Sequence, residues 1–406
     1  MAAPDPLFSP GYFANPYPTL AALRAQGPVF QTPQLGYMLF QHADVRGLAR
    51  CPHLSKALLE QARIEGLPEE AQRLAKPVLE RAKFSMLQTD PPTHTRLRSQ
   101  ATKAFTTRAA EAMRPRIEAL ADVLLDAMAE TGGMDVVRDF AFPLPAAVIM
   151  ELLGVPAADR DRLKQWTADA VTFLGALRTS ADPVAVARKG AEGNEGLRAY
   201  AADLIGKKRG NPQPDFISQL VQVQQAEDGR MNVDEVISQS VLLLAAGHET
   251  TTNLIANGLL AFLRRPEQWR ALCADPSLAR GAVDEVLRYD PPVQLTARVT
   301  TEPMEIGGVA IPAGSRIVTM LGAANRDPEH FPEPERFDIR RGAADHVSFG
   351  FDRHLCLGAH LARIEGEIAF RRFAERFPDL RLADGAALEY QANPTFRALK
   401  ALPVTF

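Results

Sequence analysis

Apolar residues recur every three or four positions over long stretches of this chain, a period that predicts helix. The stretches with this period are 114–130, 145–154, 158–177, 184–207, 232–264, 266–274, 277–289 and 359–377. Strand-like runs are short, namely Val29–Phe30, Tyr37–Phe40, Met304–Ile306, Arg316–Met320 and Leu399–Phe406. Proline-rich breaks separate the segments at 90–92, 211–214, 291–292 and 328–334. The pattern predicts a mainly α fold with a minor β portion.

No repeat, low-complexity tract or flexible linker divides this pattern. At 406 residues the chain could form two or three average domains, or one large one with a deep core. Because no boundary is visible, we expect a single domain over residues 1–406.

The longest predicted helix covers 232–264. Asn232 followed by Glu235 resembles a capping box, and Arg264-Arg265-Pro266 supplies a cationic last turn and a stop. Its 33 residues would span about 50 Å at 1.5 Å per residue, enough to cross the protein. Because it is apolar through 241–247, we expect that part to be buried.

Composition and charge exclude several classes of protein. Hydrophobic residues make up 46% and charged residues 23%, which is typical of a soluble globular protein. A net charge of −3 gives no reason to expect nucleic acid or an anionic membrane as a partner. The N-terminus has neither signal-peptide nor anchor features, and no apolar run reaches the length of a membrane span. Three widely spaced cysteines argue against a disulfide framework, so we expect a cytoplasmic protein.

The most informative segment is Phe349-Gly-Phe-Asp-Arg-His-Leu-Cys-Leu-Gly358. It places Cys356 in a glycine-bearing loop just before the predicted helix 359–377, where the helix dipole favours a thiolate. Such a thiolate is a metal ligand or a nucleophile, and the glycines favour a ligand because they allow close approach of something flat. Alternatively, Cys356 is a small buried apolar residue. A cysteine-protease nucleophile is a further alternative, although the local signatures of those enzymes are absent.

The middle of the long helix contains Ala246-Gly-His-Glu-Thr-Thr251. Residues 243, 246, 247 and 250 share one face, and most of them are small, so another group could lie against it. Glu249 and Thr250 together could relay protons from solvent. The alternative is helix packing through small residues, with Glu249 in a structural role.

Several other motifs contain charged residues, which usually lie on solvent-exposed faces. His94 and Arg98 lie at i, i+4 on a helix that starts near Asp90, and Arg298 follows a short extended run. Glu285 and Arg288 are an i, i+3 pair, which alone is weak evidence. Residues 96–116 hold six cations (96, 98, 103, 108, 114, 116) against Glu111. This patch lacks interleaved aromatic residues, so an acidic electron carrier fits better than nucleic acid.

These motifs, in this order from about Pro16 onward, resemble the cytochrome P450 family. The Cys356 loop is similar to the family's heme-binding pattern Phe-Gly-x-Gly-x-His-x-Cys-x-Gly, except that Asp352 replaces a glycine. If that position needs a positive φ, Asp tolerates it better than most residues. The resemblance implies the cytochrome P450 fold, with the long central helix over a buried heme b and Cys356 as the axial iron ligand.

The resemblance also implies roles for single residues. Glu249 and Thr250 would be catalytic, and a buried triad of Glu285, Arg288 and Arg336 would be structural. The implied cofactor-binding residues are His94, Arg98, Ala246, Arg298, Phe349, Gly350, His354, Cys356 and Gly358, with His94, Arg98, Arg298 and His354 on the heme propionates. The implied substrate pocket draws on residues 84–88, Phe173, Leu243, Ala246, Val293, Leu295 and Phe396, a mainly apolar set.

The expected function is that of a bacterial heme-thiolate monooxygenase. It would insert one oxygen atom from O2 into a hydrophobic small molecule, using two electrons from a ferredoxin or flavodoxin supplied by an NAD(P)H-dependent reductase. We expect a monomer without nucleic-acid or membrane partners. Two alternatives are a peroxide-driven heme-thiolate oxygenase and a non-catalytic heme-thiolate binding or sensor protein. The acid–alcohol pair Glu249–Thr250 counts against both.

Overall fold

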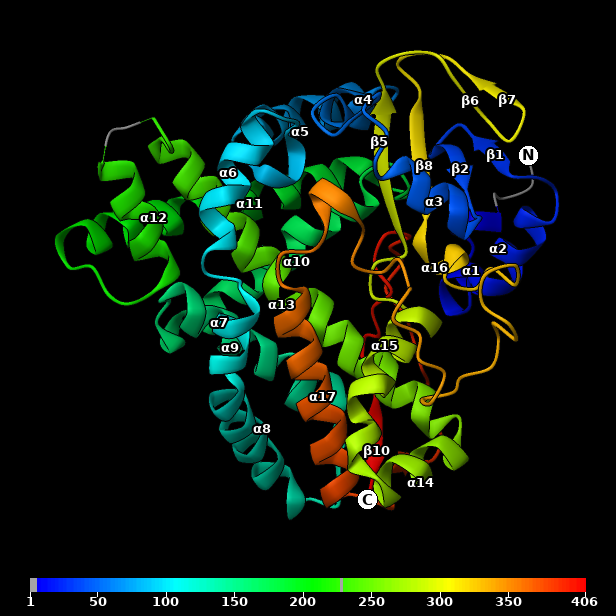
Figure 1. The fold of residues 1–406 in the computed structure, drawn as a ribbon. Coiled ribbons are helices and arrows are strands. Elements are labelled where there is room, and N and C mark those ends of the chain that lie inside the picture. The colour runs from blue at the N-terminus through cyan, green and yellow to red at the C-terminus, as the bar shows by residue number, and fades with distance from the viewer. Residues whose placement is uncertain (1–5, 227–228) are drawn as a thin grey trace.

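The computed structural model describes residues 6–226 and 229–406. Residues 1–5 and 227–228 of the predicted domain 1–406 lie outside the described residues. Helices form most of the molecule, and a small sheet region lies to one side of them (Figure 1). The described helices are α1 (Pro10–Ala14), α2 (Tyr17–Arg24), α3 (His42–Leu48), α4 (Leu59–Ile64), α5 (Glu69–Arg81), α6 (Thr93–Thr102), α7 (Thr107–Ala112), α8 (Arg114–Ala129), α9 (Pro143–Leu153), α10 (Arg160–Ala176), α11 (Pro183–Gly210), α12 (Phe216–Gln225), α13 (Val233–Leu263), α14 (Pro266–Ala274), α15 (Ala279–Tyr289), α16 (Leu321–Ala324) and α17 (Ala359–Arg376). Short helical turns join them at η1 (Pro6–Phe8), η2 (Ala82–Phe84), η3 (Met86–Gln88), η4 (Val137–Ala141), η5 (Ala157–Asp159), η6 (Pro276–Leu278) and η7 (Asp352–His354).

The strands form three sheets. The largest has the order β1 (Val29–Thr32), β2 (Gly36–Leu39), β8 (Arg316–Met320), β5 (Leu295–Thr300) and β3 (Leu54–Ser55). Strands β2 and β8 are parallel, and the other neighbours are antiparallel. A second sheet has the order β4 (Gly133–Asp135), β10 (Pro403–Thr405) and β9 (Arg381–Leu382), and a hairpin joins β6 (Met304–Ile306) to β7 (Val309–Ile311).

The predicted α fold with a minor β portion is confirmed, and the periodic stretches become α8 to α11, α13 to α15 and α17. The predicted helix 277–289 is divided into η6 and α15. The predicted strand Leu399–Phe406 is too long, because only β10 and an isolated bridge between Tyr390 and Leu399 form there. The short helices α1 to α4 were not predicted, because they are too short to show several turns of the period. The 13-residue α5 was also not predicted; it carries Pro77 in its interior, a residue that normally ends a helix.

The long helix α13 begins and ends where its sequence signals place it. The side chain of Asn232 accepts from the Glu235 amide and the Glu235 carboxylate accepts from the Asn232 amide, so the capping box is present. The helix passes through the middle of the molecule and packs against α9, α11, α15 and α17 (Figure 1). Gly258 allows the contact with α17, because a Cβ there would lie 2.3 Å from the ring of Phe370. None of the described helices is both long enough and apolar enough to cross a membrane.

Burial along α13 differs from the expectation in one place. Leu243 and Leu244 are buried, as predicted, but Ala246 is exposed and its neighbours on either side are only half-buried. This stretch is apolar because it forms the wall of an internal cavity rather than the interior of a packed core.

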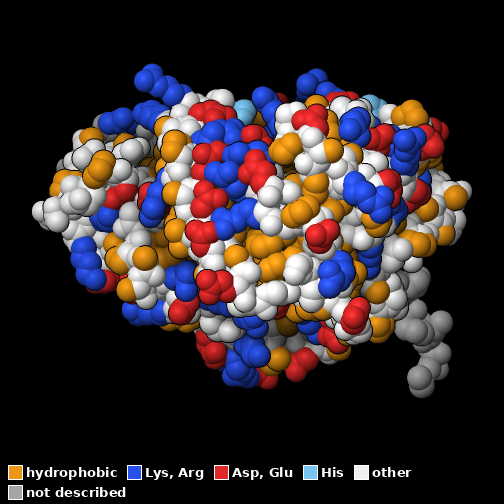
Figure 2. Space-filling model, turned by 90° about the horizontal axis from the view of Figure 1, so that it is seen from below, with side chains coloured by type: hydrophobic (Ala, Val, Ile, Leu, Met, Phe, Trp, Pro, Cys, Tyr) orange, Lys and Arg blue, Asp and Glu red, His pale blue; other side chains and the backbone are white. Residues whose placement is uncertain are grey.

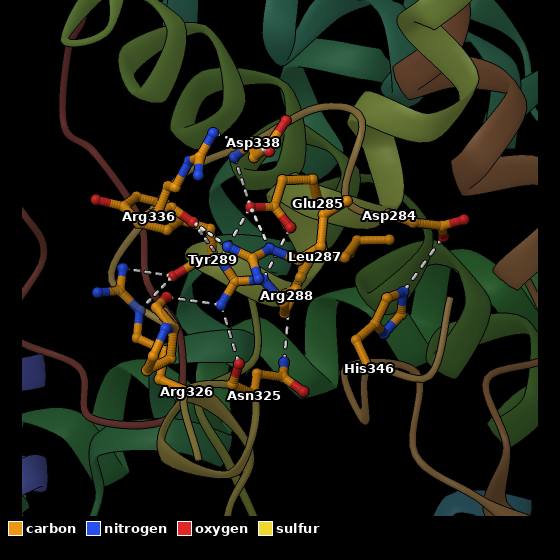
Figure 3. Close-up of polar contacts among 12 residues, drawn as sticks. Asp284, Glu285, Leu287, Arg288, Tyr289, Asn325, Arg326, Arg336, Asp338 and His346 are labelled. Atoms are coloured by element: carbon orange, nitrogen blue, oxygen red, sulfur yellow. Dashed lines mark hydrogen bonds and ion pairs between the residues drawn. The ribbon is translucent and has the colours of Figure 1, made fainter. Parts of the chain in front are cut away.

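A buried ion pair fixes the segment that leads toward Cys356. Arg288 and Glu285 of α15 are fully buried, and Arg288 donates to both carboxylate oxygens at 2.8 and 2.9 Å (Figure 3). Arg288 also donates to the main-chain oxygens of Asn325, Pro334 and Arg336. The pair therefore ties α15 to chain that follows α16.

The prediction that the side chain of Arg336 completes a buried triad with Glu285 and Arg288 is wrong. The side chain of Arg336 is 58% exposed and pairs with Glu333 and Asp338, so only its carbonyl takes part. Arg341, which is 15% exposed, places its Nε 3.4 Å from Glu285 instead. A sequence pattern locates the loop here, but it cannot tell which of two arginines in that loop turns inward.

Candidate functional site

A cavity of about 570 Å³ is lined by α13, the Cys356 loop and strands β5 and β8. It brings together the residues that the sequence singled out as catalytic, cofactor-binding or pocket-forming, except Phe84 of the predicted segment 84–88, which is not on the lining. Those on its lining are Ser85 to Gln88, His94, Arg98, Phe173, Leu243, Ala246, Glu249, Thr250, Val293, Leu295, Arg298, Phe349, Gly350, His354, Cys356, Gly358 and Phe396. Phe173 is only 3% exposed and also packs against Gly190, so it offers the cavity little of its surface.

The Cys356 loop is held by its own main chain. The amide of Cys356 donates to the Phe349 oxygen at 2.8 Å, and the amide of Leu355 donates to the Asp352 oxygen at 3.0 Å. Gly350 has φ of 68° and Asp352 has φ of 55°, so the left-handed conformation expected at Asp352 is confirmed. Its carboxylate lies 3.7 Å from Arg353 Nε.

Cys356 lies on the cavity lining, and the surface that it exposes lies there. Burial raises the pKa of this thiol, while the Gly358 amide, Arg98 and Arg363 act in the opposite direction. The position before α17 therefore does not by itself produce a thiolate. Coordination to a metal cation would, because a coordinated thiol is deprotonated.

Among the described residues, four basic side chains near the loop have no acidic partner within ion-pair distance. Both ring nitrogens of His94 and Nε2 of His354 have no hydrogen-bond partner in the described part of the chain, and the two rings lie 4.3 Å apart. Arg98 donates to the Leu355 oxygen at 2.6 Å, and Arg298 is largely enclosed. Burial and nearby cations lower the pKa of His354 to about 2. Orphaned donors of this kind fit an anionic group such as the carboxylate edge of a heme.

Lys56 belongs to the same region, although no sequence motif marks it. Its ammonium donates to Thr296 Oγ1 at 2.9 Å. Burial, followed by Arg298 and Arg63, lowers the pKa of Lys56 to about 7. Lys56 precedes α4 and is far from Cys356 in the sequence, so no local sequence pattern could have predicted that it lies in this region.

The α13 wall carries the predicted acid and alcohol. The hydroxyl of Thr250 donates to the Ala246 oxygen at 3.2 Å, as expected for a threonine within a helix. Burial raises the pKa of Glu249, and Lys164 opposes this shift. A raised pKa lets this carboxyl hold and release a proton nearer to neutral pH.

Two other residues of this motif are structural. A Cβ on Gly247 would lie 2.5 Å from Ile149, so helix packing explains this glycine. His248 is buried, with Nδ1 2.9 Å from the Leu244 oxygen and Nε2 3.2 Å from Thr167 Oγ1. Burial lowers the pKa of His248 to about 4, so the ring is neutral and joins α13 to α10.

Glu365 on α17 is a further buried acid on the cavity lining. Burial raises its pKa to about 8, and its Oε2 has no partner in the described residues. The sequence of α17 has the pattern of an ordinary amphipathic helix, so nothing in the spacing of its residues predicted that Glu365 would line the cavity.

The positive patch within 96–116 is smaller than the sequence suggested. Arg96 pairs with Glu235, Arg114 with Glu111 and Glu367, and Arg116 with Glu151. Basic and acidic side chains are likewise interspersed on the face seen from below, with no large field of one sign (Figure 2). Within 96–116, Lys103 and Arg108 are the cations that stay exposed and form no ion pair with any described residue.

Comparisons with known proteins identify the family of this chain. The family model for cytochrome P450 matches residues 52–378. The chain is 41% identical to cytochrome P450 monooxygenase PikC of Streptomyces venezuelae, over 97% of this chain and 91% of that protein. It is 42% identical to vitamin D(3) 25-hydroxylase of Pseudonocardia autotrophica, over 98% and 96%. The solved structure of P450BioI with hexadec-9Z-enoic acid ligated acyl carrier protein is similar with a TM-score of 0.89, at 36% identity and with 98% and 99% coverage. The chain belongs to the cytochrome P450 family and is an oxidoreductase of its monooxygenase class.

Proposed function

We propose that the protein holds heme b through Cys356 and inserts one oxygen atom from O2 into a hydrophobic organic substrate. The observation that carries this proposal is the meeting of three features in one cavity. These are the Cys356 thiol, the acid–alcohol pair of α13 and the unpaired basic side chains. Bound heme would supply the activation of O2, which no side chain of the protein can provide.

The residues present suit that cofactor. His94, Arg98, Arg298 and His354 would bind the propionates, since planar or charged donors recognise carboxylates. Ala246 offers a methyl group on one wall, and Gly350 and Gly358 present main chain without a side chain at two positions of the loop. At Gly358 a Cβ would meet no neighbouring atom within 4 Å, so the space beside the loop is open.

Glu249 and Thr250 would deliver protons to the reacting oxygen. Thr250 presents its hydroxyl at the cavity wall while that hydroxyl is bonded only to a main-chain oxygen. Glu249 lies next in sequence with a raised pKa, so it can pass a proton from the Lys164 side of the helix. This arrangement supports a monooxygenase more than a binding or sensor protein.

The substrate would be largely apolar. Leu243, Val293, Leu295 and Phe396 all lie on the lining. The named relatives include a vitamin D(3) hydroxylase, and the P450BioI complex contains a long-chain fatty acid. Vitamin D(3) and the fatty acid of that complex are both large hydrophobic molecules, and the apolar lining of this cavity suits such molecules.

Electrons would come from a ferredoxin or flavodoxin supplied by an NAD(P)H-dependent reductase. Lys103 and Arg108 are exposed near the end of α6 and in α7, and could attract an acidic carrier. We further propose that the protein acts in the cytoplasm as a single-domain monomer.

The test is product formation by heme-loaded protein with a surrogate ferredoxin, its reductase, NAD(P)H and isotopically labelled O2. We expect labelled oxygen in the product and NAD(P)H consumption that depends on the ferredoxin. Turnover with hydrogen peroxide alone, but none with ferredoxin, would favour the peroxide-driven alternative. Binding without turnover in both systems would favour a sensor.

A further inference from the structure

One part of the cavity lining carries an excess of buried positive charge that the functions above do not use. Arg63 of α4, Arg178 after α10 and Arg316 of β8 form a guanidinium cluster there. Arg178 Nη1 lies 3.4 Å from the main-chain oxygen of Arg63, and all three arginines lie on the lining. In keeping with this geometry, burial first and then Arg63 and Arg178 lower the pKa of Arg316 to about 9.

Two members of the cluster are held in place by the protein. Arg178 donates to the main-chain oxygens of Gln34, Ala62, Arg63 and Glu65. Arg63 donates to the Leu174 oxygen at 2.6 Å, and its Nε is 3.5 Å from Glu60. These contacts fix the guanidinium groups without neutralising more than one of them.

Arg316 differs from its neighbours. Its Nε and Nη1 are buried and have no hydrogen-bond partner in the described residues. Glu60 is the acid on this part of the lining, and it already lies next to Arg63. Glu65 is exposed beside Arg178, while the lining acids Glu249 and Glu365 lie on α13 and α17. A buried cation with unmade hydrogen bonds is costly unless an anion completes it.

The guanidinium cluster adjoins the proposed propionate site, with Lys56 near both Arg298 and Arg63, but Arg316 and Arg298 point to different sides of the sheet. In the antiparallel ladder Arg316 is opposite Val299, whereas Arg298 is opposite Ile317. Successive side chains alternate between the two faces of a sheet, so Arg316 and Arg298 lie on opposite faces. The face of Arg316 is the one that carries Leu295, which the sequence assigned to the substrate pocket.

We propose that Arg316, with Arg63 beside it, binds a carboxylate at one end of an otherwise apolar substrate. An arginine presents parallel donors that match the two oxygens of a carboxylate, and the bond strengthens away from water. Leu174, whose main-chain oxygen accepts from Arg63, is half-buried on the lining and would contact the adjoining hydrocarbon. The inference rests on the proposed function, and it names the substrate class as apolar carboxylic acids.

The test compares straight-chain carboxylic acids with the primary alcohols of the same chain lengths. Binding to heme-loaded protein is measured by calorimetry and by the Soret shift. We expect the best acid to bind at least about tenfold tighter than its alcohol, since a buried charge-assisted bond is worth that much. Arg316→Gln should remove this preference while leaving the alcohol affinity unchanged, and Arg316→Lys should keep part of it. Arg340→Gln, at an exposed arginine, is the matched control and should behave as wild type.

Equal affinities of acid and alcohol in the wild-type protein would overturn the inference, whether or not Arg316→Gln folds. An equal loss of both ligands in Arg316→Gln, or a loss of heme with the acid preference intact, would also overturn it. Calorimetric binding does not depend on turnover. A protein that prefers acids but forms no product would therefore refute the proposed function and not this inference.

Discussion

Replacing Arg288 by Gln is the perturbation whose cost follows most directly from the structure. Arg288 makes five hydrogen bonds, two to Glu285 and three to main-chain oxygens, with no exposed surface. The variant would leave Glu285 with the Asp338 amide at 2.8 Å and the more distant Arg341. It would also leave the three main-chain oxygens with fewer donors.

The expected loss is about 3–5 kcal/mol, the usual cost of removing one partner of a buried ion pair. This is a large part of the roughly 5–15 kcal/mol that stabilises a typical folded protein. Arg341→Gln removes a partner at 3.4 Å and bonds to exposed loop oxygens, so we expect about 1–2 kcal/mol. Arg336→Gln removes an exposed side chain and should cost less than about 0.5 kcal/mol.

The assay is urea unfolding followed by tryptophan fluorescence, with heme content measured on the same samples. Trp269 is 4% exposed and contacts Phe262 in the core beside α15, so it reports on this region. The predicted order of loss is Arg288→Gln, then Arg341→Gln, then Arg336→Gln. The reasoning would be refuted if Arg336→Gln cost as much as Arg288→Gln.

Three further predictions concern the site. Thr250→Ala should keep heme and substrate binding but divert NAD(P)H to hydrogen peroxide; unchanged product per NAD(P)H would remove Thr250 from the proton relay. The double variant Lys103→Glu, Arg108→Glu should slow reduction by an acidic ferredoxin and leave peroxide-driven turnover intact. Raised salt should also slow this reduction in the wild-type protein, because salt screens charge attraction over about 10 Å at 0.1 M. A rate insensitive to both changes would exclude this docking surface. Asp352→Gly should stabilise the protein by up to about 1 kcal/mol in a melting experiment, because glycine relieves the backbone strain of the left-handed conformation at φ 55°. An unchanged melting temperature would mean that the ion pair with Arg353 already offsets this strain.

Much of the helical fold is predictable because the sequence repeats its signals over many turns. The capping box at Asn232 and the stop at Arg264 give α13 almost to the residue. The Cys356 loop is equally clear, since its chemistry is contained in ten consecutive positions.

The errors share a physical cause, because each depends on contacts between distant segments. Arg336 and Arg341 are five residues apart, and only packing against α15 decides which one reaches Glu285. Lys56 and Arg316 look like ordinary surface residues of a loop and a strand end until the fold places them on the cavity lining. Arg96 and Arg114 appear as free cations until their acidic partners from α13 and α17 are brought beside them.

The axial ligand is the central claim, and the spectrum of the reduced protein with CO tests it most directly. The wild-type protein should show the strongly red-shifted Soret band of thiolate-ligated heme. Cys51→Ser and Cys273→Ser should retain this band, because both cysteines lie outside the cavity lining. Cys356→Ser should lose it. A red-shifted band that persists in Cys356→Ser would contradict the assignment of Cys356 as the ligand.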